Sequence, residues 1–196
     1  MIASVENRRS IRRYKSAAVP KNLIEEVLKA GALAPSSKNR QPWKFVVVSG
    51  EAKEKMLAAM QEGLKREKER ALLPESSGHL GGAEQTLRIM REAPVVICIV
   101  NTLGISLFQS LSAEERVYEI CNAQSLGAAL ENMALLATEL GLGSLWICDT
   151  YFAYDELKAW LGSAGEPFAA MAIGYAAEAP RPRPRRALRD IVEWRG

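Results

Sequence analysis

The sequence has little of the chemistry that metal sites and nucleophilic enzymes need. It contains one histidine, His79, and three widely spaced cysteines, Cys98, Cys121 and Cys148, without metal-ligand spacing. A zinc site needs a cluster of such ligands, and a catalytic triad would depend on His79 alone. An odd number of separated cysteines is typical of reduced thiols in a cytoplasmic protein. Zinc enzymes and triad hydrolases are therefore disfavoured, and a role for His79 stays open.

Long apolar runs and a strong net charge are also missing. No run is long enough to cross a membrane, and residues 1–10 lack the apolar stretch of a signal peptide. The net charge is only +3, with positive residues gathered at 8–13 and 181–189. Two short clusters suit a phosphate on a small ligand, whereas a nucleic-acid protein would more often have a broad basic face. We expect a soluble, cytoplasmic protein with neither a nucleic acid nor a membrane as partner.

The composition and the apolar pattern fit a globular chain with helices and strands in mixed order. Hydrophobic residues make up 48% of the 196 residues, enough for a core, and we expect a single domain over residues 1–196. Apolar periodicity and Pro or Gly boundaries predict the elements. Helices are predicted over 20–31, from 49–51 to beyond 64, over 114–140 and over 155–161; strands are predicted over 43–48, 94–100, within 141–149 and over 167–175.

Two segments between these elements are rich in polar residues. The mixed charges of residues 65–70 are typical of a solvated helix face, and no function is assigned to them. Residues 74–82 are rich in Pro, Ser and Gly, which predicts a flexible loop around His79. Neither segment contributes a predicted site.

The helix predicted over 114–140 has one broad side that can pack against a neighbour. Small residues at 123, 127 and 134 would let another backbone approach closely. A core helix is the plain interpretation, and a helix at an interface between two copies is the alternative. The residues on this side are Val117, Ile120, Gln124, Gly127, Leu130, Met133, Ala134, Ala137 and Leu140.

A polar loop and an arginine-rich stretch stand out. Residues 34–45 read APSSKNRQPWKF, in which Pro35 and Pro42 bar a helix and the Ser and Asn side chains favour turns. Residues 8–14 read RRSIRRY and put four arginines around the Ser10 hydroxyl. The loop is suited to surround a flat, hydrogen-bonding ligand, although an ordinary helix-to-strand connection explains its composition equally well. Arginine supplies a planar fork for a phosphate.

These two motifs, in this order, resemble the FMN-dependent nitroreductase family. The likeness extends over nearly the whole chain: strand 167–175 is similar to the family's IGYP element, with Ala176 in place of the usual proline. The resemblance implies an α+β, nitroreductase-like fold with a central, mostly antiparallel sheet flanked by helices. It also implies an intertwined homodimer, with a C-terminal tail of about 178–196 extending onto the partner.

The resemblance further implies bound FMN, with NADH or NADPH as electron donor, in sites shared between the two subunits. Arg9, Ser10, Arg183 and Arg185 are assigned to the phosphate, and Arg8 and Arg12 to the pyrimidine edge of the ring. The loop residues assigned to the ring and ribityl chain of the partner subunit's flavin are Pro35, Ser36, Ser37, Asn39 and Gln41. The segment assigned to the reactive side of the ring is Leu145, Trp146, Ile147 and Cys148.

The implied activity is ping-pong hydride transfer through flavin N5 to nitroaromatic, quinone or related small-molecule acceptors. The cofactor carries the chemistry, so no catalytic side chain is predicted. Another reduction on the same fold and cofactor, such as dehalogenation or enone reduction, stays open, as do flavin fragmentation and a non-enzymatic flavin-binding module. Cys148 stands where many members have glycine, and a nucleophilic role is disfavoured because no histidine is available to activate it. The family's lid falls within 61–113, where no residue is assigned.

Overall fold

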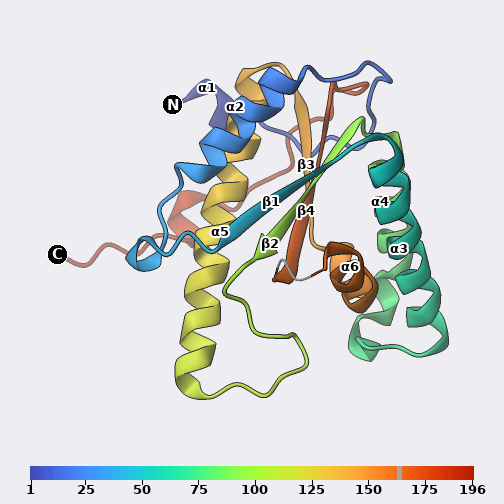
Figure 1. Ribbon diagram of the computed structural model, residues 1–196. Coiled ribbons are helices and arrows are strands. Elements are labelled where there is room, and N and C mark those ends of the chain that lie inside the picture. Colours follow the sequence, from blue (N-terminus) through green and yellow to red (C-terminus); the bar gives the residue numbers. More distant parts are fainter. Residues whose placement is uncertain (163–164) are drawn as a thin grey trace.

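The computed structural model describes residues 1–162 and 165–196, and Figure 1 shows helices on both faces of one sheet. The strands are β1 (Trp43–Val48), β2 (Val95–Asn101), β3 (Gly143–Ile147) and β4 (Glu166–Gly174). Their order is β1-β2-β4-β3, and each neighbouring pair is antiparallel. The predicted α+β class and antiparallel sheet are confirmed. Because β1 and β3 are the outer strands, each has one edge without a neighbouring strand of this sheet.

The helices are α1 (Ala3–Asn7), α2 (Lys21–Ala32), α3 (Gly50–Glu69), α4 (Leu80–Glu92), α5 (Ala113–Glu139) and α6 (Tyr154–Leu161). Short 3-10 turns lie at η1 (Ser37–Asn39), η2 (Pro74–His79), η3 (Asp149–Ala153) and η4 (Leu188–Asp190). α5 begins with a capping box, in which the Ser112 side chain accepts from the Glu115 N–H and the Glu115 side chain accepts from the Ser112 N–H. None of the helices in the described residues is long and apolar enough for a bilayer.

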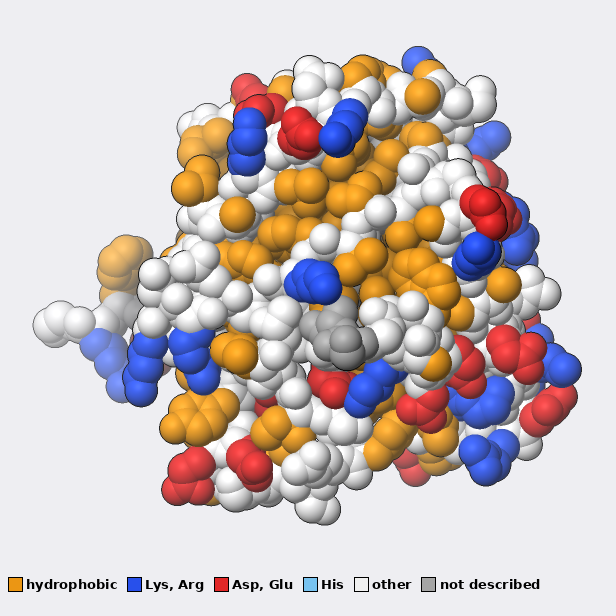
Figure 2. Space-filling model, viewed as in Figure 1, with side chains coloured by type: hydrophobic (Ala, Val, Ile, Leu, Met, Phe, Trp, Pro, Cys, Tyr) orange, Lys and Arg blue, Asp and Glu red, His pale blue; other side chains and the backbone are white. Residues whose placement is uncertain are grey.

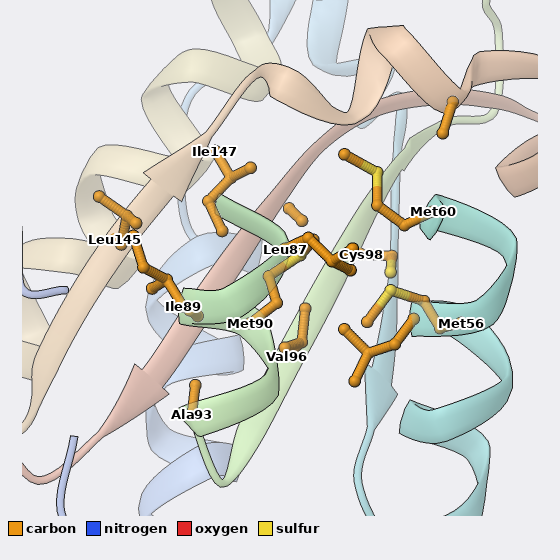
Figure 3. Close-up of a cluster of buried hydrophobic side chains, with 14 of the residues drawn as sticks. Met56, Met60, Leu87, Ile89, Met90, Ala93, Val96, Cys98, Leu145 and Ile147 are labelled. Atoms are coloured by element: carbon orange, nitrogen blue, oxygen red, sulfur yellow. The ribbon is translucent and has the colours of Figure 1, made fainter. Parts of the chain in front are cut away.

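The sheet separates two apolar clusters, because successive side chains of a strand point to opposite faces. On β2, Val96 and Cys98 face α3 and α4, whereas Ile97 and Ile99 face α2 and α5. Figure 3 shows the first cluster, in which Met56, Met60 and Met90 from the two helices meet the sheet. β2 is buried along its whole length, as its continuous apolar run predicts.

Two sequence predictions for the middle of the chain are wrong in part. Helix α4 begins at Leu80, so the segment predicted as a loop over 74–82 ends three residues earlier, at the last residue of the turn η2. Within the predicted solvated face 65–70, Glu67 is only 2% exposed. Its carboxylate accepts hydrogen bonds from the backbone N–H groups of Leu72 and Leu73 and pairs with Arg66. The charge pattern could not reveal that one carboxylate turns inward to hold the chain after α3.

The predicted packing side of α5 is buried only in its second half. Leu130, Met133 and Ala137 are buried, but Val117 is 56% and Ile120 52% exposed. The buried residues in the first half of α5 are instead Asn122, Ser125 and Leu126. The face that holds Val117 and Ile120 is therefore apolar and uncovered within this chain. Hydrophobic side chains are also visible in the middle of the face in Figure 2, over the edge strand β1.

Candidate functional site

Backbone pairing brings the two arginine-rich ends of the chain together. Tyr14 forms an antiparallel bridge with Ala176, and the N–H of Ala177 donates to the carbonyl of Arg13 at 2.9 Å. Beyond this bridge, the Glu178 carboxylate accepts from the backbone N–H groups of Arg12 and Arg13. Glu178 was not singled out from the sequence, since a lone acid between basic stretches gives no signal of its own. It ties the start of the tail to the N-terminal arginines.

The result is one pocket of about 360 Å³ lined by both ends of the chain. All six arginine and serine residues predicted for the cofactor from these ends line it: Arg8, Arg9, Ser10, Arg12, Arg183 and Arg185. The remaining lining residues are Val5, Glu6, Pro180, Arg181 and Pro182. The predicted division into a phosphate end and a ring end is not resolved, because all six line the same pocket.

The arginines of this pocket keep most of their positive charge available. Arg8 meets the Glu131 carboxylate of α5 at 3.3 Å. Arg9 donates to the backbone carbonyl of Glu6 at 2.6 Å, and Arg12 donates to the carbonyl of Ser10 at 3.2 Å. A backbone carbonyl carries no net charge, so these bonds orient the guanidinium groups without neutralising them. The donor set fits a phosphate.

The pocket adjoins the free edge of β3. Ser10 forms a parallel bridge with Ser144, and the N–H of Ile11 donates to the Ser144 carbonyl at 3.0 Å. Since backbone groups of alternate residues point to the same edge, the N–H and carbonyl of Trp146 also face away from β4. Trp146 has a side chain 39% exposed, next to the small residue Gly127 of α5. A polar backbone edge and an aromatic face therefore lie next to the anion pocket.

The other predicted residues of this strand differ in exposure. The side chains of Leu145 and Ile147 are buried in the core, so only their backbone could reach a ligand. Cys148 is exposed, and its thiol pKa is raised by partial burial and by the Asp149 carboxylate, while a hydrogen bond with Trp146 acts in the opposite direction. A raised pKa leaves little thiolate at neutral pH, which argues against a nucleophile. His79 is exposed in η2, between α3 and α4.

The predicted ring-binding loop lies elsewhere in the chain, on α5. The backbone N–H of Ser37 donates to Ser125 Oγ at 3.2 Å, and Arg40 donates to Asn122 Oδ1 at 3.2 Å. Asn122 is nine positions before Glu131, which Arg8 contacts. At about 100° per residue, nine residues turn the helix by about 900°, so the two side chains point to opposite sides of α5.

The loop is shaped by its own side chains, and it does not join the arginine pocket within one chain. Ser36 Oγ accepts from the N–H of Gln41 at 3.0 Å, and Gln41 Nε2 donates to Asn39 Oδ1 at 3.2 Å. Pro35, Asn39 and Gln41 are exposed, and Ser36 and Ser37 are half-buried. A ligand that used both the loop and the pocket would have to meet them from two copies of the chain.

The fold places this protein in the α+β class, and the donors that line its pocket suit a small phosphorylated molecule. Residues 5–175 match the Nitroreductase family, and the chain belongs to that family. The resemblance drawn from the two sequence motifs is thereby confirmed.

Relatives and solved structures agree with this assignment. The chain is 31% identical, over 87% of its length and 82% of the relative's, to a candidate NADH dehydrogenase or NAD(P)H nitroreductase of Archaeoglobus fulgidus. A candidate nitroreductase from Desulfovibrio desulfuricans, solved in complex with FMN, is 28% identical with a TM-score of 0.71, covering 100% of this chain and 96% of its own. An FMN and NADPH-dependent nitroreductase from Sphigopyxis sp. strain HMH has a TM-score of 0.76 over 99% and 98% of the chains. At 21% identity it bears on the fold alone.

Proposed function

We propose that this chain is an FMN-dependent NAD(P)H oxidoreductase that works as a homodimer and reduces nitroaromatic, quinone or related acceptors. The observation that carries the proposal is the single pocket lined by arginines from both ends of the chain, beside the free edge of β3. Two relatives described above support the cofactor and the electron donor, since one was solved in complex with FMN and the other is named an NADH dehydrogenase or NAD(P)H nitroreductase.

The pocket residues would hold the phosphate of FMN. Arg9, Ser10, Arg183 and Arg185 supply guanidinium and hydroxyl donors, and each hydrogen bond to a charged group contributes about 1.5–3 kcal/mol. Arg8 or Arg12 would place a cation near the pyrimidine edge, which favours extra negative charge there. When bound, FMN supplies hydride transfer at N5, accepting from NADH or NADPH and donating to the acceptor in a second half-reaction.

The strand edge of β3 would orient the flavin ring of FMN. The backbone N–H and carbonyl of Trp146 are unclaimed by β4 and suit the polar edge of a flat ring. The exposed indole of Trp146 adds an apolar wall that excludes water from one side. No protein acid is required in this proposal, so the acceptor's proton can come from solvent.

The homodimer in this proposal rests on two features of α5. Its first half carries the uncovered apolar face of Val117 and Ile120, together with the exposed small residue Ala123. The loop 35–41 and the arginine pocket lie on opposite sides of the same helix. A second copy that covered the apolar face could bring its own loop toward this pocket, and each site would then draw on two chains.

The first experiment is the visible absorption spectrum of the purified protein before and after anaerobic addition of NADH or NADPH. We expect flavin bands that bleach within seconds and return when menadione or a nitroaromatic is added. A protein that stays colourless after addition of FMN would overturn the proposal. A yellow protein that neither nicotinamide reduces would favour the non-enzymatic flavin-binding module. An acceptor screen on the reduced protein separates nitro or quinone reduction from dehalogenation and enone reduction.

A further inference from the structure

The loop that precedes β1 is held in an unfavourable backbone conformation. Lys38, Asn39 and Gln41 have φ of 53°, 54° and 48°, in the left-handed region that side chains other than glycine rarely adopt. Such a backbone conformation is unfavourable for a residue with a side chain and persists only where surrounding contacts fix it. Three strained residues within four positions need external anchors. The residue between them, Arg40, supplies one.

Arg40 is fixed to α5 by two kinds of contact. Its guanidinium donates to Asn122 Oδ1 at 3.2 Å and lies 5.1 Å from the centre of the Tyr118 ring. A planar cation over an aromatic face is a favourable arrangement that lysine reproduces poorly. The Nε atom of Arg40 is buried without a hydrogen-bond partner among the described residues. Burying this group without a partner costs desolvation free energy, which the other contacts of Arg40 must offset.

The anchor on α5 is itself rigidly held. Asn122 is 2% exposed, and its Nδ2 donates to Glu119 Oε1 at 3.2 Å and to the Leu103 carbonyl at 3.5 Å. Glu119 also accepts from Asn101 at the end of β2, at 3.5 Å. Arg40 therefore connects the loop, through Asn122, to the sheet. A buried polar network of this kind specifies one geometry.

We propose that Arg40 is a positioning residue that clamps the strained loop 36–41 onto α5, in the geometry that presents its Ser, Asn and Gln groups to FMN. The identity of the ligand as FMN rests on the proposed function, whereas the contacts by which Arg40 holds the loop do not depend on it. Arg40 acts through the loop and not through contact with the cofactor. Without it, the strained residues relax, the loop samples other conformations, and the cofactor must reorder it on binding.

The first test measures the clamp in the protein without cofactor. Two loop amides report on it: the N–H of Ser37, bonded to Ser125 Oγ, and the N–H of Gln41, bonded to Ser36 Oγ. In Arg40→Ala, hydrogen exchange at both amides should become at least about ten times faster, while exchange in β2 and β4 stays unchanged. Lys44→Ala is the matched control, because it removes an exposed cation from the adjoining strand. Unchanged exchange at Ser37 and Gln41 would overturn the clamp.

The second test measures FMN affinity by fluorescence titration of the same proteins. Arg40→Ala should raise the Kd for FMN by about ten-fold or more, with Lys44→Ala close to wild type. Arg40→Lys keeps the positive charge but lacks the planar fork, so its affinity for FMN should be only slightly higher than that of Arg40→Ala. If Arg40→Ala does not fold, Arg40→Lys replaces it in the titration. Ethylguanidinium, but not ethylammonium, should partly restore binding to Arg40→Ala. Equal affinity for FMN in wild type and both Arg40 variants would overturn the inference. A wild-type protein that binds no FMN would overturn the proposed function but would leave the hydrogen-exchange result unaffected.

Discussion

At the scale of single residues, the exposed tail arginines are the most direct test of the pocket. Arg183→Ala should raise the Kd for FMN by about ten- to a hundred-fold, because it removes a charged donor from the phosphate. The pocket includes Arg183 but not Arg189, which is exposed and pairs with Asp190 at 3.7 Å. Arg189→Ala is therefore the control and should bind FMN as wild type does. Equal losses in both variants would indicate a general charge effect.

The thiols of Cys98 and Cys148 should differ sharply in reactivity. Burial raises the pKa of Cys98 to about 12 and also raises the pKa of the exposed Cys148. Because the thiolate is the reactive form, iodoacetamide should label Cys148 slowly at pH 7, about ten times faster per pH unit as the pH rises towards its pKa. Cys98 should stay unlabelled until urea unfolds the protein. Mass spectrometry of the labelled peptides measures both rates, and rapid labelling of Cys148 at pH 7 would contradict the raised pKa.

At the scale of the elements, two glycines in neighbouring helices should respond to alanine in opposite ways. A Cβ on Gly63 of α3 would lie 2.2 Å from the Cβ and 2.4 Å from the Cα of Ala153. Gly63→Ala should therefore lose about 1–3 kcal/mol of unfolding free energy, despite the better helix propensity of alanine. A Cβ on Gly81 of α4 meets nothing within 4 Å, so Gly81→Ala should gain about 0.4–1 kcal/mol.

Urea unfolding at one fixed protein concentration measures both changes. The concentration must be fixed because the stability of an oligomer depends on it. A Gly63→Ala protein as stable as wild type would mean that η3 can move away from α3. Comparison of Gly63→Ala with Gly81→Ala therefore tests how closely α3 packs against Ala153.

The elements also show how far sequence reasoning reached and where it stopped. The strands were predictable because continuous apolar runs such as that of β2 are short and bounded by turn residues. The first turn of α4 was missed because Gly81 and Gly82 give a loop signal that the burial of Ala83 and Leu87 overrides. The role of Glu67 was missed since its partners are backbone N–H groups, which leave no trace in a side-chain pattern.

At the scale of the whole molecule, the sequence could not separate two kinds of apolar helix face. Ile120 and Met133 carry the same apolar signal on α5, yet only Met133 is buried within the chain. A helix face that packs on the sheet of its own chain and one that packs on a second copy of the chain favour the same residue types, so apolar periodicity cannot distinguish them. The pocket was predictable in its composition, but its assembly depends on the Tyr14–Ala176 bridge, which joins residues far apart in the sequence.

The uncovered face leads to a prediction about assembly. Ile120→Asp should place a charge on the exposed first half of α5 without disturbing the chain's own core, because Ile120 is 52% exposed. We expect wild type to sediment as a dimer and Ile120→Asp as a folded, colourless monomer with wild-type circular dichroism. An Ile120→Asp dimer that retains FMN would show that the second copy packs elsewhere.

Shared sites make a further prediction that no single-chain site can satisfy. Ser37→Ala removes a hydroxyl from the loop, and Arg185→Ala removes a guanidinium group from the pocket. Each variant alone should therefore bind FMN poorly in both of its sites. In a mixed dimer, the loop of the Arg185→Ala chain meets the pocket of the Ser37→Ala chain, and that site is intact. The other site carries both changes. Random mixing makes about half of the dimers mixed, so about a quarter of all sites should regain FMN and NAD(P)H-dependent reduction.

Co-expression with two different affinity tags isolates the mixed dimer and raises the expected recovery to about half of the wild-type sites. Each variant must first be shown to be folded by circular dichroism, and a mixture of Ser37→Ala with Ser37→Ala carrying the second tag is the control for handling. If the purified mixed dimer binds no more FMN than its parents, then each site is built from one chain. In that case the loop on one side of α5 and the arginines on the other would serve different ligands, and only the arginine pocket would remain as the place where FMN binds.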